Sequence, residues 1–462
     1  MNRFLAVLVL CCLVAACSFG GGRPSAAPSG HGPSVYAGRI GLAGYTLVVP
    51  PSWNRDLVLY SHGYQAPGSP VGSAPDVANN PAGQWLLAHG YALAGSSYSS
   101  SGWAVEQALA DQVAVLDAFS ARVGRPRRVI AWGHSLGGLV SAALVQVYPD
   151  RFAAALPMCG VLAGGVATWN LALDAAFALR TLISPQSTVE LVHISDPKRN
   201  AAAGVSIENS AQDTVAGRAR LALVAALADV PGWFDPFQAE PSPTDYAAQE
   251  VNQYRWLSQV DASFSFQYRA ELEQRAGGNP SWNTDVDYAS MLSQSRNRAE
   301  VAALYQAAGL SLAADLARLA SAPRISADPA ASAYLTRWVT FGGQLAVPVL
   351  SLHTTGDGLV PVESERAYAL AVAAAGSSDR LRQAFVHRAG HCFFTPAETV
   401  AAFQLLFQRL DTASWPVAQD GVAERLNSMA AALGADLNRL PIGTQPAQPA
   451  FIAYQPGSFP RS

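Results

Sequence analysis

The chain has 462 residues but few lysines, histidines and cysteines, and it contains no run of basic residues. Lys198 is its only lysine, and the formal net charge is -3. Domains that bind nucleic acid normally carry a basic patch, so we expect no nucleic-acid partner. The chain also lacks the H-E-x-x-H, C-x-x-C and G-x-x-x-x-G-K-S/T patterns of metal, redox and phosphate-binding sites. No metal or organic cofactor is therefore predicted.

The apolar run near the N-terminus is too short to span a membrane and is typical of an export signal. Arg3 precedes the apolar residues 4–13, and the small residues 14–16 stand directly before Cys17. Small residues before a cysteine also resemble a bacterial lipobox. This resemblance implies that residues 1–17 form the signal peptide and lipobox, and that Cys17 is lipidated and becomes the mature N-terminus. The exported protein would then be anchored to a membrane in the cell envelope. The alternative is a secreted protein with an ordinary cleaved signal, in which Cys17 has no role.

Export changes how the cysteines are interpreted. Cys11 and Cys12 leave with the signal and Cys17 takes the lipid, so only Cys159 and Cys392 remain. Two cysteines in an oxidising compartment favour one disulfide. Two buried free thiols are the alternative.

Five further stretches differ in composition and periodicity. Residues 18–34 are rich in Gly, Pro, Ser and Ala, which is typical of a flexible tether. Apolar runs alternate with helical patterns over residues 35–160 and 344–410, which predicts βαβ units and a parallel sheet. Residues 161–343 are mainly helical in pattern, and residues 411–462 predict a short helix and a tail packed on the core. The expected strands are Tyr45–Val49, Asp56–Tyr60, Tyr91–Ser97, Phe152–Met158, Val347–His353 and Gln383–His387.

One pentapeptide, Gly133-His134-Ser135-Leu136-Gly137, follows the apolar run 128–132 and precedes a stretch with helical spacing. Its flanking glycines allow a tight turn from strand to helix. Such a turn holds the serine Oγ clear of the backbone and points the next amide to where an oxyanion forms. Ser135 is therefore the candidate nucleophile.

A serine hydroxyl is a weak nucleophile, so it needs a nearby base and an acid that orients the base. Asp357 lies in a glycine-flanked turn directly after an expected strand. His391 lies in a loop between the last expected strand and a helix. We therefore predict that His391 is the base and Asp357 the acid.

Other titratable residues near these positions are weaker candidates. His387 is only four residues from His391, but it falls within the expected strand, where a structural role is favoured. Asp379 follows Gly376-Ser377-Ser378 in what we interpret as a surface turn. Glu363 and Glu365 fall on the helix after Pro361, where we expect them to be solvated.

The order Ser135, Asp357, His391, with the patterns G-x-S-x-G, G-D-x-x-V-P and A-G-H, resembles the α/β-hydrolase superfamily. The resemblance covers both stretches with βαβ patterns. It implies an α/β-hydrolase fold, with a mostly parallel sheet flanked by helices. It also implies that residues 161–343 are a large helical cap, or lid, inserted after the strand that follows the nucleophile.

The segment Tyr60-Ser61-His62-Gly63-Tyr64-Gln65 follows an early expected strand and resembles the family's H-G-x oxyanion loop. The third residue of that loop supplies a backbone amide. The resemblance therefore implies an oxyanion hole made by the amides of Tyr64 and Leu136, with His62 shaping the loop.

The two remaining cysteines are both expected at the edge of the sheet above which this fold builds its site. Tannases and feruloyl esterases are similar in having a disulfide-bonded cysteine beside the catalytic histidine. Their second cysteine directly precedes the nucleophile, where this chain has His134. We predict that Cys159 and Cys392 form a disulfide that clamps the loop of His391.

The insertion contains aromatic side chains that suit either an apolar acyl pocket or the interior of the cap itself. The second interpretation is favoured, because large aromatic side chains are generally buried. The tryptophans in question are Trp169, Trp233, Trp256, Trp282 and Trp338.

These observations predict an exported serine hydrolase that cleaves carboxylic esters, small or oligomeric, through an acyl-enzyme. Because the same triad serves other acyl transfers, an exported aminopeptidase or amidase is the first alternative. A non-catalytic surface-binding lipoprotein on a hydrolase scaffold is the second. The presence of nucleophile, acid, base and oxyanion loop together argues against it.

Overall fold

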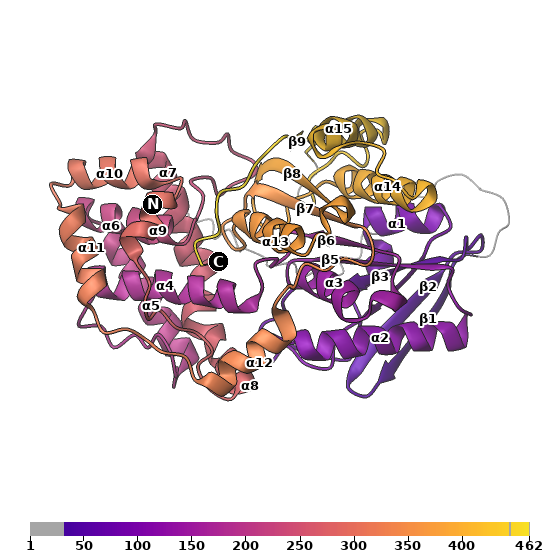
Figure 1. Ribbon diagram of the computed structural model, residues 1–462, viewed down its shortest axis with the longest axis horizontal. Helices are drawn as coiled ribbons and strands as arrows, with labels where there is room; N and C mark the ends of the chain where they lie inside the picture. Colours follow the sequence, from indigo (N-terminus) through magenta and orange to yellow (C-terminus); the bar gives the residue numbers. More distant parts are fainter. Residues whose placement is uncertain (1–31, 443–444, 462) are drawn as a thin grey trace, which may run out of the picture.

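The computed structural model describes residues 32–442 and 445–461, so the predicted signal, Cys17 and most of the tether lie outside the described residues. Its centre is a nine-stranded sheet in the order β1-β2-β4-β3-β5-β6-β7-β8-β9, with helices on both faces (Figure 1). The strands are β1 (Ser34–Ile40), β2 (Ala43–Val49), β3 (Asp56–Ser61), β4 (Ala92–Ser96), β5 (Arg128–His134), β6 (Ala154–Met158), β7 (Val349–Gly356), β8 (Leu381–Ala389) and β9 (Phe451–Ile452).

Strands β4, β3, β5, β6, β7 and β8 run parallel. The pairs β1–β2, β2–β4 and β8–β9 are antiparallel. The inner strands are apolar along nearly their whole length because helices cover both of their faces, as β6 illustrates with every residue buried. This sheet confirms the predicted fold class. Two strands were not predicted: β1, at the edge, has no fully buried residue, and β9 has only two residues.

Helices in two layers sandwich the sheet, and apolar clusters fill the space on each side. On one face lie α2 (Val105–Arg122), α3 (Leu136–Val147) and α13 (Glu363–Ala374). On the other lie α1 (Pro81–Ala88), α14 (Pro396–Thr412) and α15 (Val422–Ala432). Trp132 of β5 contacts Phe403 of α14, with ring centroids 5.2 Å apart. Short 3-10 turns lie at Val77–Asn79, Pro149–Arg151, Ser378–Arg380 and Gln419–Gly421.

A helical cap separates β6 from β7 and lies beside the sheet (Figure 1). It has a buried apolar cluster of its own. The longest cap helix, α4, has the length and hydropathy of a membrane-spanning helix, but 61% of that segment is buried, as in the core of a folded domain. The cap helices are α4 (Gly165–Ile183), α5 (Pro197–Gln212), α6 (Val215–Leu227), α7 (Tyr246–Trp256), α8 (Arg269–Ala276), α9 (Tyr288–Gln294), α10 (Arg298–Ala307), α11 (Leu312–Ser321) and α12 (Pro329–Val339), with π-helical turns at Leu257–Asp261 and Phe264–Tyr268.

The C-terminal tail crosses from the sheet to the cap. Phe451 in β9 pairs with β8 and is buried in the core beneath α14 and α15. Phe459 is buried in the cluster of the cap. The tail therefore contacts both parts of the molecule.

Candidate active site

Ser135 occupies a sharp turn between β5 and α3, with a backbone φ of 58° and ψ of -124°. A non-glycine residue adopts a positive φ only where the surrounding structure holds it there. A Cβ on Gly137 would lie 2.0 Å from the carbonyl oxygen of Ser61, and one on Gly133 would lie 2.3 Å from that of Gly137. Both positions therefore require glycine, and the turn presents Ser135 at the carboxyl end of β5.

The loop after β3 lies directly against this turn. A Cβ on Gly63 would lie 3.4 Å from the Cβ of Ser135. Tyr98 fixes the loop from behind, because its hydroxyl donates to the carbonyl of His62 at 3.0 Å and its ring stacks on the His62 ring at 3.8 Å. The amide of Gln112 on α2 donates to the Ser61 hydroxyl at 2.8 Å. The loop is therefore held at both its start and its middle.

The backbone amides of Tyr64 and Leu136, both beside Ser135, are among those that have no acceptor among the described residues. Leu136 is the first residue of α3, where unpaired amides and the helix dipole favour negative charge. The sequence predicted these two amides as oxyanion donors, and the structure brings the Tyr64 loop and the start of α3 to the same side chain, Ser135.

His391 and Asp357 form a close pair. The Nδ1 of His391 lies 2.7 Å from the Oδ2 of Asp357. The other carboxylate oxygen accepts from the amides of Leu359 and Val360, each at 3.0 Å. Burial alone would raise the pKa of Asp357, but the neighbouring His391 and His353 outweigh it and lower the pKa below its usual value. Asp357 is therefore a charged acceptor that orients the His391 ring.

His353 lies on the far side of Asp357, and the sequence analysis predicted for it only a place on a strand. Its Nε2 is 3.5 Å from Asp357 Oδ2 and 2.9 Å from the carbonyl of Val360, and its Nδ1 is 3.1 Å from Glu365 Oε1. Burial lowers its pKa, but the hydrogen bonds to Asp357 and Glu365 outweigh this and raise it to about 10. Because both ring nitrogens face acceptors, His353 carries a positive charge between two carboxylates.

The prediction that Glu363 and Glu365 are solvated is wrong, since both are buried. α13 packs these first-turn residues inward. Glu365 accepts hydrogen bonds from Ser351 and Gln383, in addition to facing His353. Its polar partners come from the strands β7 and β8 and not from its own helix, so the helical pattern alone did not reveal its burial.

Ser135 and His391 are not joined by a hydrogen bond in the described part of the chain. The Nε2 of His391 lies 3.4 Å from the Sγ of Cys392. Contacts between nucleophile and base are often long in a free enzyme and tighten only with substrate bound. His134, inside the same turn, is half-buried, and its ring lies close enough to His391 to be affected by it. Burial and the charge of His391 lower its pKa to about 4, so it is neutral.

Cys159 and Cys392 form a disulfide, with Cα atoms 5.3 Å apart, and the prediction of this bond is confirmed. Cys159 follows β6, and Cys392 follows His391. Both have a positive φ, as Ser135 has, so three strained non-glycine positions meet at the site. The two sulfurs and His391 lie within 4.8 Å of one another. Sulfurs that are bonded to each other supply no thiolate, so this group does not fit a metal ion.

The rival candidates lie elsewhere. His387 is exposed on β8, and its Nε2 lies 3.2 Å from Glu240 of the cap. Asp379 is exposed in the 3-10 turn Ser378–Arg380. Neither reaches the turn of Ser135.

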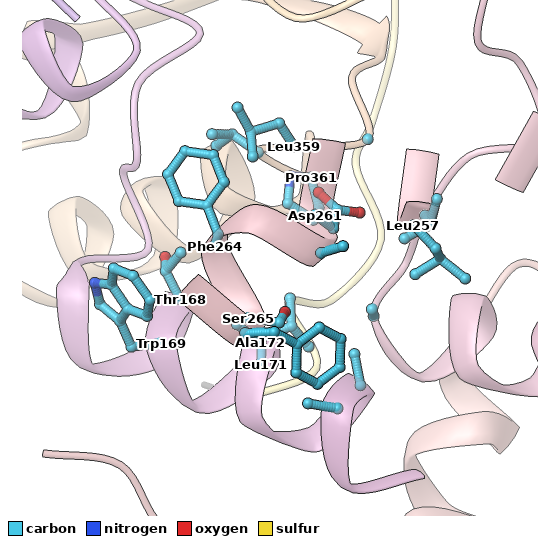
Figure 2. Close-up of a pocket in the computed structure, with 18 of the residues that line it drawn as sticks. Thr168, Trp169, Leu171, Ala172, Leu257, Asp261, Phe264, Ser265, Leu359 and Pro361 are labelled. Carbon is cyan, nitrogen blue, oxygen red and sulfur yellow. The ribbon is translucent and has the colours of Figure 1, made fainter. Parts of the chain in front are cut away.

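A cavity connects Ser135 with the interior of the cap. Its walls come from α4, the two π-helical turns and the loop after Asp357, as Figure 2 shows. Tyr64 faces the ring of Phe264 at 5.1 Å, and Trp169 contacts Trp103 at 5.4 Å. Of the tryptophans in the insertion, Trp169 lines the cavity, whereas Trp256 belongs to the cap interior. The cap aromatics therefore include both residues that line the pocket and residues that fill the interior of the cap, the two alternatives that the sequence left open.

Comparison with known proteins agrees with this fold. Residues 88–394 match the family described as alpha/beta hydrolase fold, and the chain belongs to that family. It is therefore a hydrolase of the α/β fold. The chain is 31% identical over 448 residues to an o-phthalyl amidase of Xanthobacter agilis, which covers 87% of this chain and 94% of the relative.

Similar solved structures include two other hydrolases. An acylaminoacyl peptidase of Pyrococcus horikoshii has a TM-score of 0.37 at 10% identity over 85% of this chain. The match spans only 44% of that peptidase. The rice cell wall degrading esterase LipA of Xanthomonas oryzae has a TM-score of 0.34 at 14% identity, over 74% of this chain and 77% of the esterase.

Proposed function

We propose that the chain is a serine amidase that cleaves a carboxylic amide through an acyl-enzyme. The observation that carries the proposal is the His391–Asp357 pair, at 2.7 Å, in the same site as the strained Ser135 turn. The likeness to an o-phthalyl amidase supports an amide as substrate. This reverses the order of preference drawn from the sequence, in which an ester came first.

In the proposed reaction Ser135 Oγ attacks the amide carbonyl and its proton passes to His391 Nε2. The amides of Tyr64 and Leu136 stabilise the oxyanion of the tetrahedral intermediate. His391 then protonates the leaving nitrogen as the C–N bond breaks, which an amine requires because it is a poor leaving group. Water deacylates Ser135 with the same groups in reversed roles.

The test compares a 4-nitroanilide with the 4-nitrophenyl ester of the same aromatic acid. We expect the wild-type chain to cleave both, and Ser135→Ala to lower kcat/KM for both by about 10³-fold or more. Ser210→Ala, which removes an exposed serine from α5, serves as the matched control and should leave both rates unchanged. Turnover of the ester with no detectable cleavage of the anilide would favour the ester hydrolase, and unchanged activity of Ser135→Ala would contradict the mechanism.

We also propose that the enzyme acts outside the cytoplasm, anchored by a lipid on Cys17. The disulfide between Cys159 and Cys392 supports this, because disulfides persist mainly in oxidising compartments. Labelling with a radioactive fatty acid in the native host, lost in Cys17→Ala, tests the anchor.

A further inference from the structure

The cavity that contains Ser135 is largely apolar, but two carboxyl groups line it: Glu208 of α5 and Asp261, the last residue of a π-helical turn. In the described part of the chain, no lysine, arginine or histidine lines the same cavity. Neither acid is used in the proposed reaction. π-helical turns inside helices frequently occur at functional sites.

Glu208 is only 3% exposed, and one of its carboxyl oxygens, Oε2, has no hydrogen-bond partner among the described residues. A buried polar atom that lacks a partner is costly and uncommon in a folded protein. Glu208 also lines the cavity, so a ligand bound there can supply a partner for its carboxyl group.

Asp261 extends the same acidic surface towards the loop after the proposed catalytic acid. Figure 2 shows it among the lining side chains beside Pro361. Its carboxylate accepts no hydrogen bond from the described residues. Burial, followed by the charges of Glu208 and Asp357, raises the pKa of Asp261 well above its ordinary value, and burial raises that of Glu208 to about 8. Glu208 is therefore close enough to Asp261 to contribute to the rise in its pKa.

We propose that Glu208 and Asp261 form a subsite for a protonated amine, so that the substrate is an amide carrying an ammonium group in its apolar portion. The proposal rests on the proposed function, because Ser135, which lines the same cavity, would cleave the amide bond of the molecule whose ammonium group the two acids bind. It refines the aminopeptidase-or-amidase class to substrates with a free basic amine.

A cation fits the cavity better than an anion does. An ionised carboxylate only accepts hydrogen bonds, and an ammonium group only donates them. A cationic ligand also offsets the repulsion between the two carboxylates, and it thereby stabilises their charged forms. An anionic ligand would meet two acids and, among the cavity-lining residues of the described chain, no basic side chain to neutralise it.

The test measures binding to the Ser135→Ala variant by isothermal titration calorimetry at neutral pH, so that it does not depend on catalysis. Three ligands of similar size are compared: hexylammonium, 1-hexanol and hexanoate. We expect hexylammonium to bind at least about tenfold more tightly than 1-hexanol, with hexanoate weakest. Adding Glu208→Gln and Asp261→Asn should remove this preference while leaving the Kd of 1-hexanol within about twofold.

Glu250→Gln is the matched control. Glu250 is also a buried carboxyl of the cap and its pKa is also raised, to about 7, but it accepts from Gln212 and does not line the cavity. Its removal should leave all three affinities unchanged. If the double variant does not fold, it is replaced by the single variants Glu208→Gln and Asp261→Asn. Thermal melting checks that each of these is folded.

Equal affinity for hexylammonium and 1-hexanol, or a preference that survives in the double variant, would overturn the subsite. Tighter binding of hexanoate would overturn it as well, since the pair would then act as neutral hydrogen-bond donors. Because binding and turnover are measured separately, failure of the subsite leaves the kinetic test of Ser135 intact, and the reverse also holds.

Discussion

His353 lies one layer behind the proposed triad, with Asp357 on one side of its ring and Glu365 on the other. A charged imidazole in this position keeps a negative charge on Asp357 despite complete burial. Asp357 in turn fixes the ring of His391. His353 is thus a positioning residue that acts through Asp357 and has no contact with substrate in the proposed reaction.

This arrangement predicts how stability depends on pH. The pKa of His353 is raised from 6.5 to about 10, so its contribution to stability is complete below pH 6.5 and declines as the pH rises towards 10. We expect the free energy of unfolding to fall by up to roughly 1 kcal/mol per pH unit across this window. Urea unfolding at several pH values measures the slope.

His353→Gln provides the comparison, because a glutamine keeps hydrogen-bonding capacity without a titrating charge. The variant should be less stable at pH 7 and should show a flatter dependence on pH. A slope equal to that of the wild-type chain would show that His353 is not the titrating group.

Among the elements, the two loops that carry Cys159 and Cys392 depend on each other. The disulfide joins positions 233 residues apart and adjoins His391 directly. Removing a native disulfide typically costs about 2–5 kcal/mol. We expect Cys159→Ser with Cys392→Ser to lower the free energy of unfolding by this amount and also to lower kcat, because the loop of His391 gains freedom.

Thiol titration checks the bond itself. In a chain that begins after Cys17, unfolded without a reducing agent, we expect no reactive thiol. Two reactive thiols per chain would show that the disulfide is absent. A double serine variant as stable and as active as the wild-type chain would show that the disulfide contributes to neither property.

The elements that follow local patterns were the ones that could be predicted. The turn at Ser135 needs its glycines and the strand before it, and all of these are adjacent in sequence. β9 could not be predicted, since only pairing with β8 makes Phe451 part of a strand. Asp261 was also missed, because a π-helical turn changes which residues share a face and no short pattern marks it.

In the whole molecule, the cap and the sheet share the candidate site. The sheet supplies the turn of Ser135 and the His391–Asp357 pair, and the cap supplies most of the cavity wall. α8 of the cap is tied to the core, since Glu271 accepts from the amide of Trp103 at 2.9 Å and Arg275 donates to Ser100 at 2.8 Å. The order of Ser135, Asp357 and His391 along the chain predicted the α/β-hydrolase fold. The cavity could not be predicted in the same way, because it depends on contacts between residues over 100 positions apart.

Substrate preference is therefore a property of the assembled molecule. The sequence favoured an ester because nothing in it marked an acidic group near Ser135. The folded chain brings Glu208 and Asp261 to the cavity from two different cap elements. A different cap on the same sheet would be expected to change the substrate and leave the acyl-transfer chemistry in place.

The most direct test of the mechanism is covalent trapping of the nucleophile. The wild-type chain is treated with a fluorophosphonate and digested, and the modified peptide is identified by mass spectrometry. We expect a single adduct on Ser135, loss of hydrolytic activity in step with labelling, and no adduct in Ser135→Ala. An adduct on another residue that accompanies the loss of activity, or full activity with Ser135 modified, would contradict the assignment of Ser135 as the nucleophile.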